Sequence, residues 1–440
     1  MKNIAIIGAG IAGLSAAEHL SGKGHNVHVY EIKPSPGGRI YSLKDKTTGD
    51  MVDNGQHILV GAYRRTLQLM ELSGTTEKLK TYNGLDIQFR ANDVFHRIKY
   101  CSLPGKLSAL GGLLGFTALN LKEKMKLISF ASKVNNENYS ALKDDCYSYL
   151  LKNGQSMKVI KFFWEPLILA TINNKPKDAP AKLLVKILQD AFFKGNKESA
   201  LILPKVDLSK LIVPLTETLA DRGVKFHFGT NIRSVNLDES TCKGLITSKN
   251  EFDADAVIST VQPNILARLL PEKVNISGTL KSFSFSPIIS TYLWYDRQFL
   301  AEDIYALIDT NIQWVFNKRN FSENDPVIKE KYPAFLSLTT SAAGDMIKMR
   351  SEDIIKTADK EIKHVFPEAD RAELLHGKVI KEKQATFKAD IFTENIRPDS
   401  KTGIQNFYLA GDWTNTSYPA TIEGAALSGL NAAFEIQKEG

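Results

Sequence analysis

Residues 5–13 read AIIGAGIAG, and this stretch decides the fold of the first part of the chain. It begins inside a short apolar strand, residues 2–7, and runs directly into Gly8, Gly10 and Gly13. The chain then continues as an apolar helix (14–22), a second strand (27–30) and Glu31. A strand, glycine turn, helix, strand and acid about 20 residues further on form the pattern of a dinucleotide-binding unit.

Each residue of this pattern has a physical role. Gly8 permits the tight turn, Gly10 lets the backbone approach a pyrophosphate, and Gly13 allows close packing of helix and strand. The start of the helix, where Ala12 lies, offers free N–H groups and a partial positive charge to that pyrophosphate. Glu31 is expected to accept hydrogen bonds from ribose hydroxyls.

A second glycine turn follows at residues 36–39, which read PGGR. Gly38 allows another close approach to the pyrophosphate, and Arg39 suits its counter-ion. A nicotinamide enzyme needs no such element, so the turn favours FAD. The alternative is an exposed loop with a solvated arginine.

The other end of the chain carries a matching stretch, LAGDWTNTSYPATIEGAALSG, at residues 409–429. Residues 404–410 read as a buried strand that Gly411 and Asp412 terminate. Asp412 is expected to bond the ribityl or phosphate region of a flavin nucleotide.

Thr421 is predicted to be the N-cap of a helix over residues 422–434. A helix that begins at Ile422 beside a flavin would stabilise the negative charge of the reduced ring. By itself this is an ordinary strand–turn–helix. Beside the first motif it predicts that both ends of the chain share one flavin site.

The whole chain has 440 residues, of which 43% are hydrophobic, and this length predicts two domains. A net charge of +7 is mild and fits a weak attraction to an anionic membrane surface. There is no basic and aromatic pattern typical of nucleic-acid binding.

The three cysteines, Cys101, Cys146 and Cys242, are isolated and without metal-ligand spacing. They predict neither a disulfide framework nor a metal site. None lies in the C-terminal flavin block, so noncovalent FAD is expected. Because the chain begins directly with a strand of the nucleotide-binding unit, we expect no signal peptide and a cytoplasmic location.

Four further blocks carry a family resemblance. They are residues 53–57 (DNGQH) running into 61–63 (GAY), 163–167 (FWEPL) continuing to Ala170, Thr171 and Asn173, 203–209 (LPKVDLS), and 419–425 (PATIEGA). With these blocks the chain resembles the flavin amine oxidase and carotenoid desaturase superfamily over nearly its full length. Within that superfamily it is most similar to the hydroxysqualene dehydroxylases, also described as squalene-associated FAD-dependent desaturases.

The resemblance implies an amine oxidase-like α/β fold. A discontinuous Rossmann-type FAD-binding domain is expected from residues 1–75, 200–270 and 395–440. A substrate domain, with a mixed sheet and helices, is expected from 76–199 and 271–394. The resemblance also adds Gly55, Gln56 and Val235 to the residues expected at the cofactor, with Val235 near the adenine.

The implied activity is reductive removal of the hydroxyl of hydroxysqualene to give squalene, an isoprenoid precursor of hopanoids. It requires protonation of the leaving hydroxyl, a site that tolerates an allylic cation, and a hydride from N5 of the reduced flavin. An external reductant must recharge the flavin, and the sequence does not identify it.

Three residues are candidates for the proton donor: His57, Asp53 and Glu423. His57 titrates near neutrality when unperturbed, and it is the preferred candidate. A buried carboxylic acid at Asp53 is a second choice, although each of the three also fits a structural role. Glu423 at a helix start is stabilising without any catalysis.

Three aromatic residues, Tyr63, Trp164 and Tyr418, are candidates for lining an isoprenoid channel and stabilising cationic charge with their ring faces. Ordinary core packing is an equally good interpretation of Trp164.

Residues 107–121 read LSALGGLLGFTALNL and contain no charge, and lysines follow at 122, 124 and 126. The stretch is shorter than the roughly 20 apolar residues that span a bilayer. Segment 107–126 therefore predicts docking in the plane of a membrane surface, with a buried helix that lines the substrate tunnel as the alternative.

Three other functions stay open. A carotene or phytoene desaturase would run hydride transfer in the opposite direction, from substrate to FAD. An amine oxidase would release peroxide, and a non-catalytic membrane scaffold would show no change in flavin spectrum with any isoprenoid.

Overall fold

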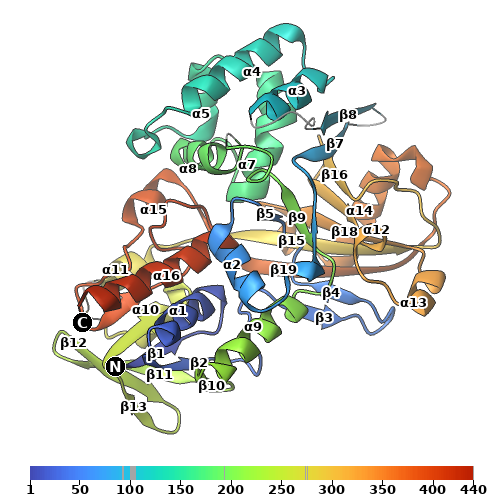
Figure 1. Cartoon of the computed structure of the whole chain (residues 1–440). Helices are drawn as coiled ribbons and strands as arrows, with labels where there is room; N and C mark the ends of the chain where they lie inside the picture. The colour runs from blue at the N-terminus through green and yellow to red at the C-terminus, as the bar shows by residue number, and fades with distance from the viewer. Residues whose placement is uncertain (92–93, 100–105, 193, 273, 275, 440) are drawn as a thin grey trace.

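The computed structural model describes residues 1–91, 94–99, 106–192, 194–272, 274 and 276–439, without the side chains of residues 106–110. Both termini lie at the end of the molecule that holds the nucleotide-binding unit, at the lower left of Figure 1. The helices of residues 106–187 gather at the opposite end, and a large sheet lies to their right.

A five-stranded parallel sheet forms the nucleotide-binding end. Its order is β10 (Lys225–His227), β2 (Asn26–Tyr30), β1 (Asn3–Ile7), β14 (Ala256–Ser259) and β20 (Phe407–Leu409). The strands come from all three stretches that were predicted to make a discontinuous FAD-binding domain, although the domain limits stay a prediction. Strand β20 is shorter than the predicted strand 404–410 because Asn406 takes a left-handed φ of 63° just before it.

Two helices from opposite ends of the chain pack on this sheet and on each other. They are α1 (Ile11–Gly22) and α16 (Ile422–Lys438), which is longer than the predicted helix 422–434. The hydroxyl of Ser15 donates to the Ala426 carbonyl at 2.7 Å. A Cβ on Gly429 would lie 2.0 Å from the Ala12 carbonyl oxygen, so only glycine allows this approach.

A seven-stranded mixed sheet forms the second half of the molecule. Its order is β19 (Leu374–Phe387), β15 (Phe285–Tyr295), β18 (Ala334–Thr340), β17 (Trp314–Asn317), β16 (Ile304–Leu307), β7 (Asp86–Ala91) and β8 (Val94–Lys99). Only β16 and β7 pair in parallel within it, and the other neighbours are antiparallel. The fold class, a Rossmann-type domain with a mixed-sheet and helical domain, is confirmed.

Helices complete this second half. The helical end comprises α3 (Lys106–Gly115), α4 (Leu121–Val134), α5 (Cys146–Lys152), α6 (Met157–Val159), a π-helical turn (Ile160–Trp164), α7 (Glu165–Ile172) and α8 (Ala181–Ile187). Helix α14 (Ser351–Val365) also belongs to this half.

The remaining elements connect these parts. The strands are β3 (Ser42–Lys44), β4 (Met51–Asp53), β5 (Leu59–Val60), β6 (Leu79–Thr81), β9 (Leu201–Pro204), β11 (Ile232–Asp238), β12 (Thr241–Thr247) and β13 (Glu251–Asp253). The helices are α2 (Arg64–Leu72), α9 (Ser209–Asp221), α10 (Pro263–Leu269), α11 (Ile276–Lys281), α12 (Lys318–Phe321), α13 (Pro326–Lys331) and α15 (Ile391–Ile396). Among the described residues, none of the helices combines the length and apolar character needed to cross a bilayer.

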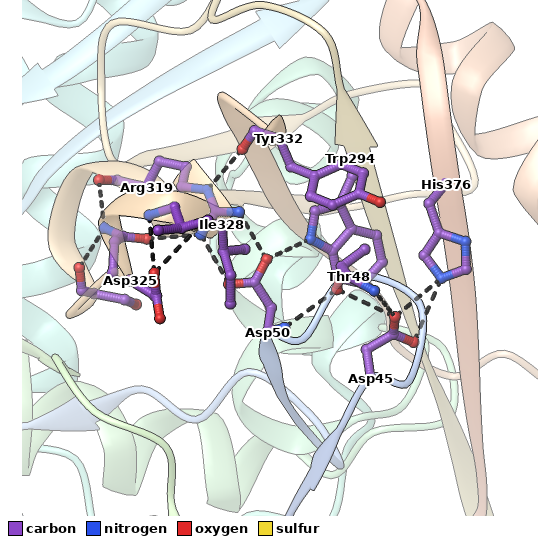
Figure 2. A network of polar contacts seen from close by, with 12 residues as sticks. Asp45, Thr48, Asp50, Trp294, Arg319, Asp325, Ile328, Tyr332 and His376 are labelled. Atoms are coloured by element: carbon purple, nitrogen blue, oxygen red, sulfur yellow. Dashed lines mark hydrogen bonds and ion pairs between the residues drawn. The ribbon is translucent and has the colours of Figure 1, made fainter. Parts of the chain in front are cut away.

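A buried ion pair ties the two halves together next to the seven-stranded mixed sheet (Figure 2). Arg319 of α12 donates two hydrogen bonds, of 2.8 and 2.7 Å, to the two carboxylate oxygens of Asp50. The Asp50 carboxylate also accepts the indole N–H of Trp294 at 2.8 Å. The pair therefore fixes the loop before β4 against α12 and β15.

Candidate functional site

One cavity of about 930 Å³ is lined by residues of both halves of the molecule. The predicted site residues that line it are Gly8, Gly10, Ala12, Glu31, Gly38, Arg39, Gly55, Gln56, His57, Tyr63, Gly411, Asp412, Thr421 and Ile422. Opposite them, the wall includes Ala170, Thr171, Ile288, Trp314, Phe316 and Thr339. The two ends of the chain thus meet at one cavity, whose far wall comes from α7 and the mixed sheet.

The first glycine turn has the geometry that a pyrophosphate site needs. Gly8 has a left-handed φ of 103°, and a Cβ on Gly13 would lie 2.1 Å from the Gly8 carbonyl oxygen. Gly13 therefore sets the contact of α1 with the turn and does not itself line the cavity. Among the described residues, no side chain accepts a hydrogen bond at the N-cap of α1, Gly10. The first N–H groups of this helix are therefore available to bind an anion.

The second glycine turn lies directly on the first. The Gly37 N–H donates to the Ala9 carbonyl at 2.9 Å. The guanidinium of Arg39 donates to the Asp412 carboxylate at 2.7 Å and to the Ala385 carbonyl at 2.7 Å. Arg39 therefore joins the N-terminal motif, the C-terminal motif and β19 at the edge of the cavity.

The acid at the end of β2 is already oriented by the backbone. The carboxylate of Glu31 accepts the N–H groups of Ala9 at 3.0 Å and of Lys33 at 2.9 Å. These two bonds hold one carboxylate against the glycine turn, where a ribose would bind.

The C-terminal motif supplies a second helix start. The hydroxyl of Thr421 accepts the N–H of Gly424 at 3.0 Å, which confirms the predicted N-cap of α16. Thr421 and Ile422 line the cavity, so the partial positive charge of the helix start faces it.

The chemistry of the cavity fits FAD. Two buried acceptors that line it, Asn54 Oδ1 and Gln56 Oε1, have no hydrogen-bond partner among the described residues. Buried acceptors need donors, and a flavin brings a ring N–H and ribityl hydroxyls. The glycine turns, both helix starts and Glu31 complete a site for the rest of the dinucleotide.

His57 lines the cavity with its ring held by the backbone. Its Nδ1 lies 2.8 Å from the Gly55 carbonyl oxygen, which can only accept, so Nδ1 carries a proton and Nε2 is left for proton exchange. Burial lowers the pKa of His57, and the cations of Arg39 and Lys318 act in the same direction. The Gly55 carbonyl and the Asp53 carboxylate oppose this shift in the pKa. The imidazole is therefore neutral at pH 7.

The other two acid candidates lie behind the cavity wall. The carboxylate of Asp53 accepts the Ser42 hydroxyl at 2.7 Å and the Leu208 N–H at 3.1 Å, and it lies 3.4 Å from Lys318 Nζ. All of these partners are protein groups, so the structure gives Asp53 a positioning role.

Glu423 caps a neighbouring helix. Its carboxylate accepts the N–H groups of Arg65 and Thr66, each at 2.9 Å, and the Thr66 hydroxyl at 2.8 Å. These N–H groups belong to the first turn of α2, where the helix itself offers no acceptor. The structure therefore supports the structural interpretation of Glu423.

Three further predicted residues lie away from the cavity wall. Trp164 is buried and donates its indole N–H to Gln155 at 3.2 Å. Tyr418 donates its hydroxyl to Asp190 at 2.6 Å. Val235 is buried in β11 within the apolar core. Of the three aromatic candidates for the channel, Tyr63 alone lines the cavity.

Sequence reasoning missed Lys318, Trp314 and Thr339. Lys318 is almost fully buried and pairs with Asp53, whereas Trp314 and Thr339 line the cavity from strands β17 and β18. Nothing local to the segments that carry Trp314 and Thr339 shows that these side chains line a cavity, although β-branched and aromatic residues are typical of strands.

This arrangement is that of a FAD-dependent oxidoreductase, because two glycine turns, two helix starts and Glu31 meet at one cavity that also borders the mixed sheet. The comparison with protein families agrees: residues 11–437 match the model for flavin containing amine oxidoreductase. The chain belongs to this family, within the amine oxidase and carotenoid desaturase superfamily.

Individual relatives fall into two groups by name. The chain is 26% identical to a hydroxysqualene dehydroxylase of Sinorhizobium fredii, over 98% of this chain and 97% of that protein. It is 27% identical to a 15-cis-phytoene desaturase of Synechococcus elongatus, over 98% of this chain and 95% of that protein. The resemblance to the dehydroxylases is thus confirmed, at an identity that the desaturases equal.

Solved structures show the same fold. An oxidoreductase from Methanosarcina mazei superimposes with a TM-score of 0.75 at 18% identity, covering 99% of this chain and 100% of that one. A putrescine oxidase gives a TM-score of 0.73 at 16% identity, with 99% of each chain covered.

Proposed function

We propose that this protein reductively dehydroxylates hydroxysqualene to squalene. Relatives bearing the name hydroxysqualene dehydroxylase from three organisms, each 25–26% identical, cover 97–98% of the chain. The observation that carries the proposal is that one cavity combines the residues of a dinucleotide site with Ile288, Trp314 and Phe316. Such a wall suits a long hydrocarbon chain and offers few nucleophiles to trap an allylic cation.

The chain's own residues would divide the work. Bound FAD supplies a hydride when reduced. The start of α16, at Thr421 and Ile422, stabilises negative charge at the flavin side of the cavity. His57 Nε2 is the exchangeable nitrogen that can deliver a proton to the leaving hydroxyl. The aromatic ring of Phe316, which also lines the cavity, favours cationic character in the substrate.

The test is product analysis. Purified holoprotein with a chemical reductant and hydroxysqualene should give squalene, identified by mass spectrometry. A new conjugated chromophore formed from phytoene, with hydroxysqualene unchanged, would show instead the desaturase function that the Synechococcus elongatus relative suggests.

Protonation of His57 is expected to set the pH dependence of turnover. The imidazolium form donates the proton, and burial lowers the pKa below its ordinary value of 6.5. Turnover at saturating reductant should therefore rise as the pH falls below 6.5, until the lowered pKa is passed. His57→Gln should reduce turnover by roughly 10²–10⁴-fold and abolish this rise, with flavin content unchanged. Near wild-type turnover in the variant would show that His57 is not the donor.

We also propose that the turn between α3 and α4 docks on an anionic bilayer surface. Leu114, Leu121 and Met125 are 47%, 69% and 57% exposed, and Lys122 and Lys126 are exposed beside them. Apolar side chains edged by lysines suit the interface of a bilayer that carries negative headgroups. The stretch is not one exposed helix, however, because Phe116 between α3 and α4 is fully buried and anchors it.

Vesicle co-sedimentation tests this docking. Wild type should pellet with vesicles of phosphatidylserine and phosphatidylcholine, and Leu121→Asp with Met125→Asp should stay in the supernatant. Val327 and Phe392 are also exposed, at 75% and 59%, on the distant helices α13 and α15 (Figure 1). Their replacement by aspartate is the matched control and should not change pelleting. Equal pelleting of all three proteins would contradict the proposal.

A further inference from the structure

Two unsatisfied polar atoms lie together on the substrate side of the cavity. Trp314 in β17 and Thr339 in β18 are direct cross-strand partners, so their side chains share one face of the sheet. Both residues line the cavity. Trp314 Nε1 and Thr339 Oγ1 are buried, and neither has a hydrogen-bond partner among the described residues.

The indole of Trp314 differs in this respect from the other three tryptophans. Those three donate to protein acceptors: Trp164 to Gln155, Trp294 to Asp50 and Trp413 to the Val261 carbonyl. Trp314 is only 7% exposed, so its indole N–H lacks the hydration of a donor on the surface. A bound acceptor would satisfy this buried donor.

Neighbouring polar side chains of the cavity are already satisfied by the protein. The Thr171 hydroxyl donates to the Leu167 carbonyl at 2.7 Å. The amide of Asn173 donates to Thr386 at 2.9 Å and accepts the Ala342 N–H at 2.7 Å. Apart from the acceptors Asn54 Oδ1 and Gln56 Oε1, Trp314 Nε1 and Thr339 Oγ1 are the buried side-chain atoms of the described cavity lining that have no hydrogen-bond partner.

We propose that Trp314 Nε1 and Thr339 Oγ1 bind the hydroxyl oxygen of an oxygenated isoprenoid substrate and select it over a hydrocarbon. The indole N–H donates to that oxygen, and the threonine hydroxyl accepts from its proton or donates to it. A hydrocarbon leaves both atoms unsatisfied, and a site built for hydrogen bonding rejects such an analogue. This inference rests on the proposed function, and it adds that squalene, which has lost the oxygen, binds less tightly than the substrate.

Equilibrium binding to the oxidised holoprotein tests the pair, with hydroxysqualene and squalene as probes and the flavin spectrum as readout. Wild type should bind the alcohol about tenfold or more tightly than the hydrocarbon. Trp314→Phe and Thr339→Val, which keep shape and lose the polar atom, should each lower this ratio by about 3- to 10-fold. Thr171→Val, in the same cavity but with a hydroxyl already bonded to the protein, should keep the wild-type ratio.

The outcomes separate the inference from the proposed function. An unchanged ratio in both variants, or a wild-type ratio near one, overturns the role of Trp314 and Thr339 even if squalene is produced. Failure of wild type to convert hydroxysqualene overturns the proposed function whatever the binding ratio. Each substitution is tested alone, and the flavin content of each variant is measured. A variant that folds poorly is then recognised and does not decide the test.

Discussion

Asp50→Ala should lower the free energy of unfolding by about 3–5 kcal/mol, because it leaves the guanidinium of Arg319 buried without its counter-ion. The Arg319 side chain is only 1% exposed, and both carboxylate oxygens of Asp50 accept hydrogen bonds from its guanidinium (Figure 2). The variant also removes the acceptor of the Trp294 indole N–H. Urea unfolding followed by tryptophan fluorescence measures the loss.

The matched control is Asp353→Ala. Asp353 pairs with Arg350 at 3.0 Å, but the two side chains are 39% and 76% exposed. Water screens such a pair, so the control should unfold at the wild-type urea concentration. A wild-type urea midpoint for Asp50→Ala would show that the buried pair contributes nothing to stability.

The effect of Asp50→Ala should extend to the cavity. Asp50 precedes β4, which leads into the cavity-lining residues Asn54 to Ile58. Arg319 follows β17, which carries Trp314 and Phe316. Beside this pair, Lys318 and Asp53 make a second buried link between the same two segments. We therefore expect reduced flavin content in Asp50→Ala and not in Asp353→Ala.

The parts of the site that follow from local sequence could be predicted. Gly8 and Gly13 are required by backbone conformation and by contacts within a few residues, and their spacing alone identifies the turn. Thr421 was identified as a cap because a hydroxyl before an apolar run satisfies the N–H groups of the helix that follows. Both are short-range effects, and the structure shows both.

Other parts depend on contacts that no local pattern encodes. Arg319 and Asp50 are 269 positions apart, and in sequence each looks like a surface charge. Trp164 ends a π-helical turn, Ile160–Trp164, whose extra residue rotates the following side chains relative to an α-helix. The indole N–H of Trp164 donates to Gln155, and Trp164 is not part of the cavity lining. The role of Glu423 likewise depends on N–H groups of a helix more than 350 positions earlier.

Gly13→Ala should weaken flavin retention on purification. A Cβ at this position would lie 2.1 Å from the Gly8 carbonyl oxygen and 3.3 Å from Thr260 Oγ1. Backbone atoms of the turn cannot yield as a flexible side chain does, so α1 must move away from β1. That shift displaces the N–H groups at the start of α1, on which an anion depends. We expect FAD affinity to fall by at least about tenfold, since overpacking costs about 1–3 kcal/mol.

A substitution of the same kind in the same helix is the control for Gly13→Ala. A Cβ on Gly22 would meet no atom within 4 Å, so Gly22→Ala should keep wild-type affinity and add slightly to the stability of α1. Flavin content is measured from the flavin absorbance band at about 450 nm. It is measured after dialysis and again after titration with added FAD. Full flavin retention in Gly13→Ala would mean that the contact between α1 and the Gly8 turn does not position the cofactor. FAD binding would then depend on the second glycine turn and the start of α16.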